Sequence, residues 1–196
     1  MEANVYDYEP PYEMHNGEIV FMASPRPIHL HVQGKIFAIF ERYLQGNICK
    51  VFCNIDTYLY NKSDKSKNIF QPDVAIICDK TKIKENGIHG TPDLVVEILS
   101  PGTFRYDRGY KMNIYAQNGV KEYWIVDADS LSIEVYYNID YRFELKDVYA
   151  IIPEWMLAQM SEERRIQYKY EFQTSIFEDL TIRVRDVFSG VEDFKN

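Results

Sequence analysis

One glutamate inside an apolar run constrains the fold more than any other feature of the chain. Glu97 lies within residues 94–99 (LVVEIL), a short run rich in β-branched side chains that is typical of a buried strand. Burying a carboxylate is unfavourable unless a cation, a metal ion or hydrogen bonds compensate for the lost hydration. The sequence therefore predicts a buried strand that carries an acid with a partner.

A second apolar run precedes the first and suggests where that partner lies. Residues 74–78 and 94–99 are separated by a polar, lysine- and glycine-containing stretch, which predicts two strands and a loop. An antiparallel hairpin centred near Glu85 would place Asp73 opposite Glu97. Directly opposed residues have Cβ atoms about 5 Å apart, which is close enough for two carboxylates to share one divalent ion. Mg²⁺ prefers such oxygen ligands.

A rival acid, Asp93, also follows a proline and precedes the second run. Asp93 and Glu97 are four residues apart on one extended strand, which separates them by about 13 Å. One metal ion cannot bridge that distance. We therefore interpret Asp93 as a residue at the start of the strand that binds backbone groups.

A helix is predicted after the second strand, from Thr103 to about residue 118. Ser-Pro-Gly at 100–102 breaks the strand pattern, Thr103 is a suitable N-cap, and Gly119 is a suitable end. Arg108, Lys111 and Tyr115 share one face of this helix. A lone lysine on such a face is often only solvated, but this helix follows the strand of Glu97 directly, so Lys111 can lie over the carboxylates.

The segments QPDVAIICD (71–79) and GIHGTPDLVVEILSPGTFRYDRGYKMNIYAQNGVKEYWIVD (87–127) resemble the Uma family of restriction endonucleases, a branch of the PD-(D/E)XK nuclease superfamily. Residues 12–36 and 175–188 extend the resemblance to the flanks. The resemblance implies a restriction-endonuclease-like α/β (α+β) fold, with a mixed β-sheet core flanked by helices.

Carried over by residue, the resemblance implies that Asp73 and Glu97 bind the divalent metal and that the backbone carbonyl of Ile98 is a further ligand. Lys111 is then the site lysine. The superfamily usually places this lysine two residues after the second acid, where this chain has Leu99. The implied metal is Mg²⁺, with Mn²⁺ as a substitute.

Two accessory residues have alternative interpretations. Glu18 either helps to hold a metal or water, or it is an exposed strand residue. His29 either lines the site or stands at the start of a helix. The sequence does not decide between these alternatives.

These residue types fit phosphodiester hydrolysis. A bound metal supplies Lewis acidity and lowers the pKa of its water, and a fixed lysine orients that water or stabilises developing charge. The predicted function is a Mg²⁺-dependent endodeoxyribonuclease that acts on DNA, and the family implies a homodimer. Two alternatives stay open: a catalytically inactive nucleic-acid-binding or interaction module of the same fold, and a hydrolase of another phosphodiester such as RNA.

Composition limits the classes of partner. A net charge of −8 argues against a protein that coats nucleic acid, because phosphate binding depends on lysine and arginine. Tyr6, Tyr8 and Tyr12 are either base-stacking groups or packing residues. Three cysteines without a Cys-x-x-Cys pair predict reduced thiols and no zinc site in a cytoplasmic protein. No apolar run approaches the length that spans a membrane.

The absence of a Pro/Gly/Ser-rich linker predicts a single domain over residues 1–196. A local helical insertion is expected at about 153–170, where a proline starts a run of helix-forming residues. The other expected elements are strands at 13–22, 51–60, 132–137 and 141–150 and a helix at 29–45.

Overall fold

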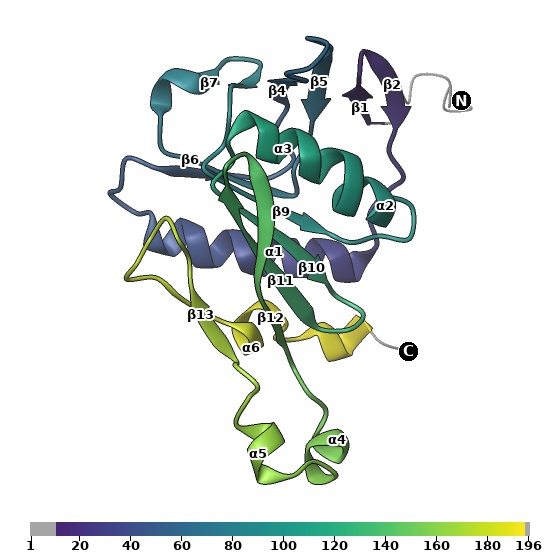
Figure 1. Ribbon diagram of the computed structural model, residues 1–196, viewed down its shortest axis with the longest axis vertical. Helices are drawn as coiled ribbons and strands as arrows, with labels where there is room; N and C mark the ends of the chain where they lie inside the picture. The colour runs from purple at the N-terminus through teal and green to yellow at the C-terminus, as the bar shows by residue number, and fades with distance from the viewer. Residues whose placement is uncertain (1–10, 195–196) are drawn as a thin grey trace, which may run out of the picture.

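The computed structural model describes residues 11–194 and is built around a six-stranded mixed sheet (Figure 1). Its strand order is β12-β11-β10-β9-β6-β3. The central pair β9 and β10 is parallel, and every other neighbouring pair is antiparallel. The strands are β3 (Lys50–Phe52), β6 (Val74–Ile77), β9 (Leu94–Ile98), β10 (Glu122–Asp127), β11 (Ser132–Ile139) and β12 (Arg142–Ala150).

A second six-stranded sheet, in the order β2-β1-β5-β4-β8-β7, lies beside the first (Figure 1). The turn between β1 and β2 is formed by Asn16 and Gly17, which both have positive φ, as a tight hairpin requires. The strands are β1 (Tyr12–His15), β2 (Glu18–Phe21), β4 (Thr57–Tyr60), β5 (Lys67–Phe70), β7 (Ile83–Lys84) and β8 (Gly87–His89). A separate pair is formed by β13 (Glu171–Gln173) and β14 (Thr181–Arg183).

Helices cover both faces of the first sheet, as Figure 1 shows. Alternate residues of β9 divide between two cores: Val96 packs with α1 (Pro27–Tyr43), and Val95 packs with α3 (Met112–Asn118). Because both faces are covered, β6 and β9 are apolar almost throughout. The predicted mixed sheet flanked by helices is confirmed.

The pairing of β6 with β9 follows the predicted register. Val74 lies opposite Val96, so the next pair in this register is Asp73 with Glu97. The connecting segment is more than a loop, however. After a 3₁₀ turn at Lys80–Lys82, it supplies β7 and β8 to the second sheet, where β8 pairs in parallel with β4.

The predicted helix at 103–118 forms in three parts: α2 (Phe104–Tyr106), a π-helical turn (Asp107–Lys111) and α3. Gly119 ends it in the left-handed conformation at φ 90°, as expected. The hydroxyl of Thr103 does not cap the helix. It lies 3.0 Å from the hydroxyl of Ser100 instead.

Other elements differ from the prediction in detail. The helix expected at 29–45 begins at Pro27, because proline suits the first helical position. The expected strand at 51–60 is two strands, β3 and β4. The expected helix at 153–170 is two short helices at the end of an arm beyond β12 (Figure 1): α4 (Glu154–Ala158) and α5 (Glu162–Arg165). The chain closes with α6 (Val184–Val187) and a 3₁₀ turn at Val191–Phe194.

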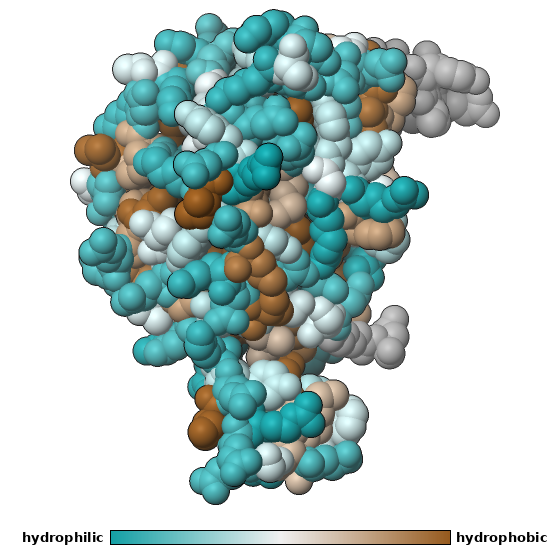
Figure 2. Space-filling view, in the orientation of Figure 1, coloured by the Kyte–Doolittle hydropathy of each residue, from teal (hydrophilic) through white to brown (hydrophobic). Residues whose placement is uncertain are grey.

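On the face drawn in Figure 2, hydrophobic residues form separate patches among hydrophilic ones. Tyr12 is exposed on β1, whereas Tyr6 and Tyr8 lie outside the described residues. Within residues 11–194, no helix is long and apolar enough to cross a membrane.

The expectation of reduced thiols is wrong for two of the three cysteines. Cys49 and Cys78 form a disulfide, and Cys53 is a free thiol. The register explains the bond, because β3 and β6 pair with Lys50 opposite Ile77, and the next opposed pair is Cys49 with Cys78. The two cysteines are 29 residues apart in the sequence, so spacing rules did not reveal this pairing.

Gly87 is the position at which the junction of β4 with β8 most needs glycine. Its φ is +131°, and an added Cβ would lie 2.3 Å from the backbone oxygen of Asp56. We expect Gly87→Ala to lower the free energy of unfolding by at least about 2 kcal/mol. Gly34→Ala is the control, because Gly34 lies in α1 with open space around it. That variant should be neutral or stabilised by about 0.5–1 kcal/mol. Equal urea midpoints for the two variants would contradict this account.

Candidate active site

Asp73 precedes β6, and both of its carboxylate oxygens are held in place. Nε2 of His29 lies 2.9 Å from Oδ1, and the backbone N–H of Ile98 donates to Oδ2 at 2.6 Å. The side chain of Gln33 donates to the backbone oxygen of Asp73 at 2.8 Å. Both His29 and Gln33 come from α1, so the helix that covers the sheet also fixes this acid.

Glu97 is buried on β9, on the face that packs against α3. Nζ of Lys111 donates to Oε1 of Glu97 at 3.1 Å, and the hydroxyl of Tyr115 donates to the same oxygen at 3.0 Å. Both hydrogen bonds end on Oε1. Lys111 and Tyr115 are four residues apart on the helix, which is why they reach one carboxylate together.

Lys111 is buried among three carboxylates. Its Nζ lies 2.9 Å from Oε1 of Glu13, 3.1 Å from Oε1 of Glu97 and 3.6 Å from Oδ1 of Asp107. Asp107 and Lys111 are the two ends of the π-helical turn. Such turns are rare and often occur at functional sites. Here the turn places an acid and a base over the strand of Glu97.

Glu13 joins this cluster from the second sheet. The backbone N–H of Gln71 donates to its Oε1 at 2.8 Å, and Nε2 of His15 lies 2.9 Å from its Oε2. Glu13 is therefore fixed by its own neighbours and is the nearest acid to Lys111. No sequence pattern indicates this role, because β1 reaches the site only through the packing of the two sheets.

The buried groups differ in how readily they hold charge. Burial raises the pKa of Glu97 well above its ordinary value, and Lys111 opposes that shift only in part. Burial also raises the pKa of Asp107. At Glu13, burial is outweighed by Lys111 and by its hydrogen-bond donors, which lower the pKa to about 2. Burial would lower the pKa of Lys111, but the surrounding carboxylates raise it well above normal. The stable ion pair is therefore that of Glu13 with Lys111.

The cluster holds more acids than bases, which suits a cation. Three buried acids surround Lys111, and Oδ1 of Asp107 has no hydrogen-bond partner. Among residues 11–194, no group of three or more His, Cys, Asp or Glu side chains is arranged so that it could hold a metal ion. Mg²⁺ does not need one, because it is usually held by one or two carboxylates together with water and substrate phosphates. Asp73 and Glu97 fit that pattern.

The other sequence candidates are placed as follows. His29 lies in the first turn of α1, and its side chain contacts Asp73. Glu18 is exposed on β2, and no contact within residues 11–194 joins it to Asp73 or Glu97. Asp93 accepts hydrogen bonds from the backbone N–H of Cys78 and from Lys121, both at 2.8 Å. Asp93, which directly precedes β9, thus binds a backbone N–H group, as predicted.

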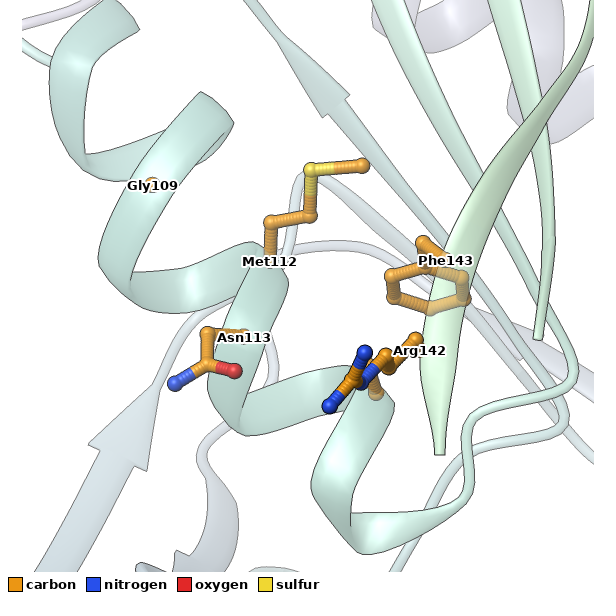
Figure 3. A pocket seen from close by; sticks show the side chains of 6 residues that line it. Gly109, Met112, Asn113, Arg142 and Phe143 are labelled. Atoms are coloured by element: carbon orange, nitrogen blue, oxygen red, sulfur yellow. The ribbon is translucent and has the colours of Figure 1, made fainter. Parts of the chain in front are cut away.

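Two hollows on the surface lie near the cluster without containing its acids. The first lies between α3 and β12, and Figure 3 shows the side chains that line it: Gly109, Met112, Asn113, Ala116, Arg142 and Phe143. The second is lined by Arg105, Tyr106 and Tyr110. Neither is lined by Asp73, Glu97 or Lys111, and the side chains of Glu97 and Lys111 are buried.

Comparison with protein families gives a match that covers the whole cluster. A family model described as "Uma2: Putative restriction endonuclease" matches residues 5–161. A Synechocystis protein described as "Uncharacterized protein slr1290" is 32% identical over 130 residues, which cover 66% of this chain and 67% of that protein.

A solved structure shares the fold. It is the crystal structure of a protein described as a putative nuclease belonging to DUF820, from Anabaena variabilis. Its TM-score is 0.67 at 19% identity, and the match covers 94% of this chain and 93% of the other. At that level of identity the likeness shows the fold alone.

Proposed function

The chain belongs to the family described as "Uma2: Putative restriction endonuclease", and from this premise we propose that it is a metal-dependent endonuclease that hydrolyses phosphodiester bonds in DNA. Family and fold together support a nuclease-like function. The observation that carries the finer proposal is the buried Lys111, which contacts Glu97 across from Asp73. Burying charged groups is costly, so a buried lysine among acids that exceed it in number points to a functional role.

In this proposal Asp73 and Glu97 hold Mg²⁺, with Mn²⁺ as a substitute and the carbonyl of Ile98 as a further ligand. Ile98 is adjacent to both acids, since it follows Glu97 and its N–H binds Asp73. When bound, the ion supplies Lewis acidity and lowers the pKa of a coordinated water. The other roles in the proposed mechanism belong to the side chains around the ion.

The side chains around the ion hold its ligands in position and stabilise negative charge on the substrate. Nζ of Lys111 faces the site as a fixed positive charge and stabilises the negative charge that develops on the phosphate oxygens. Glu13 keeps this lysine protonated and in place at 2.9 Å. Tyr115 holds the carboxylate of Glu97 from one side, and His29 holds that of Asp73. Each of these residues acts by limiting the freedom of a group that contacts the substrate or the ion.

The proposal includes three further statements. The family resemblance implies a homodimer, and the absence of a linker favours one domain over residues 1–196. A cytoplasmic location stays a prediction, although the Cys49–Cys78 disulfide removes the argument from reduced thiols that supported it. Sedimentation velocity tests the first of these statements, and limited proteolysis tests the second.

The test is cleavage of supercoiled plasmid and of single-stranded DNA with Mg²⁺, with Mn²⁺ and with chelator. We expect Asp73→Asn to lower the metal-dependent rate by at least about a hundredfold, because a metal ligand is lost. Asp93→Asn is the matched control, since Asp93 also follows a proline and binds a backbone N–H but lies at the other end of β9. Its rate should stay near that of the wild type.

Two outcomes would contradict the proposal. A wild-type protein that is folded and binds DNA but cuts under no condition would instead be the inactive binding module. Equal rates for Asp73→Asn and the wild type would remove Asp73 from the site.

A further inference from the structure

The segment that follows β9 exposes aromatic side chains beside the cluster. Phe104 and Tyr106 on α2 are both about half exposed, and Arg105 between them is exposed as well. Tyr106 and Arg105 line the second hollow with Tyr110, and these three residues define what we call the tyrosine hollow. Exposed aromatic rings grouped with an arginine are typical of binding surfaces rather than of a solvated face.

One wall of the tyrosine hollow is fixed in position. The hydroxyl of Tyr110 lies 2.6 Å from Oδ1 of Asn16 and 2.7 Å from Oδ1 of Asn68. Asn68 is fully buried on β5, and its Oδ1 also accepts from the backbone N–H of Asn16. The ring of Tyr110 is therefore held by the second sheet before any ligand arrives, which lowers the entropic cost of binding against it.

The tyrosine hollow is joined to the acids by a short chain of contacts. The ring of His15 lies 5.3 Å from that of Tyr106 and 5.5 Å from that of Tyr110, measured between centroids. His15 in turn contacts Glu13 at 2.9 Å, and Glu13 contacts Lys111 at 2.9 Å. Two side chains thus separate the tyrosine hollow from the group that we place at the scissile phosphate.

We propose that the tyrosine hollow is a subsite for one unpaired nucleobase of the DNA strand being cut. The base stacks against Tyr106 and Tyr110, and the guanidinium of Arg105 contacts a phosphate next to that base. This inference rests on the proposed nuclease function and names its substrate class, which is single-stranded or locally opened DNA. A paired base inside a duplex already has both faces covered by its neighbours and cannot stack on a side chain.

The charge of the protein favours stacking as the source of affinity. With a net charge of −8, the chain is poorly suited to bind DNA through phosphate contacts alone. Stacking on aromatic rings is independent of that charge and tolerant of sequence, because every base presents a π-face. The tyrosine hollow offers both kinds of contact, with two rings and one cation.

The experiment measures binding of oligodeoxynucleotides that carry 2-aminopurine, whose fluorescence falls on stacking. Ca²⁺ replaces Mg²⁺ so that binding is observed without turnover, and single-stranded and duplex forms are compared. Tyr106→Ala should weaken single-strand binding about tenfold and remove the fluorescence change. Tyr106→Trp should keep both. Tyr170→Ala is the control, because Tyr170 is 42% exposed, similar to 46% for Tyr106, and precedes β13 away from the tyrosine hollow.

The outcomes separate this proposal from the function on which it rests. Unchanged single-strand binding by Tyr106→Ala overturns the subsite, even if the wild type cleaves DNA. An equal loss of duplex and single-strand binding overturns the preference for unpaired bases. A wild type that quenches through Tyr106 but never cleaves in Mg²⁺ supports the subsite and contradicts the nuclease proposal.

Discussion

Replacement of Lys111 by methionine is expected to lower Mg²⁺-dependent cleavage by at least about a hundredfold while metal binding is retained. The fixed positive charge is lost, and removal of one such group from a site that stabilises developing charge typically costs this much or more. The same change removes repulsion between Nζ and the bound cation, so the affinity for Mg²⁺ should rise. Single-turnover cleavage rates and the Mg²⁺-induced shift in melting temperature measure the two effects.

Lys121→Met is the matched control for Lys111→Met. Lys121 also pairs with an acid, Asp93, at 2.8 Å, but its side chain is 64% exposed and lies away from the cluster. Its loss should leave cleavage unchanged. Lys111→Met carries a stability cost of about 3–5 kcal/mol, because three acids lose their cation. A melting transition that still responds to Mg²⁺ shows that the variant is folded. Cleavage at the wild-type rate in that folded variant would exclude Lys111 from the mechanism.

The sequence predicted the pairing of β6 with β9 at the centre of the first sheet, because the apolar runs that indicate it are a local pattern. Two apolar runs of similar length, with Asp73 before one and Glu97 inside the other, permit few pairings, and the register of β6 with β9 is the predicted one. The path between them was not predicted. The segment 79–91 contributes β7 and β8 to the second sheet, and β8 pairs with β4, which is distant in sequence. Hydrophobic periodicity is a local pattern, so it does not predict which distant strands pair.

In the candidate site, too, some residues could be identified from the sequence and others could not. Lys111 could be proposed because its helix follows directly from the strand of Glu97. Asp107 lies four residues before Lys111, so the i,i+4 rule could have identified it from sequence. Glu13 could not be identified, because its contact with Lys111 depends on how the two sheets meet. Glu18, the accessory candidate on the same β1–β2 hairpin as Glu13, is exposed.

Replacement of Glu97 by glutamine is expected to abolish the Mg²⁺ response and yet stabilise the metal-free protein above neutral pH. The raised pKa of Glu97 means that its carboxyl contributes most to stability when protonated. That contribution is fully present below the ordinary glutamate value of 4.5 and is lost as pH rises through the raised value. Glutamine is neutral at every pH, so the variant avoids the cost of a buried charge.

In chelator, the melting temperature of the wild type should therefore fall more steeply than that of Glu97→Gln as pH rises above the ordinary glutamate value of 4.5. The lowered pKa of Glu13 acts below that value, and the raised pKa of Lys111 acts only at strongly alkaline pH. With Mg²⁺ at about one hundred times its dissociation constant, the wild type should gain about 2.7 kcal/mol and the variant almost nothing.

Glu122→Gln is the control that separates metal binding from burial. Glu122 is also buried with a raised pKa, but it accepts hydrogen bonds from Ser175 and Trp124 away from the cluster. This control should show a flatter pH dependence in chelator and keep both the Mg²⁺ response and cleavage. If Glu97→Gln kept its Mg²⁺ response as Glu122→Gln does, Glu97 would be a buried structural acid, and the metal would have to be held without it.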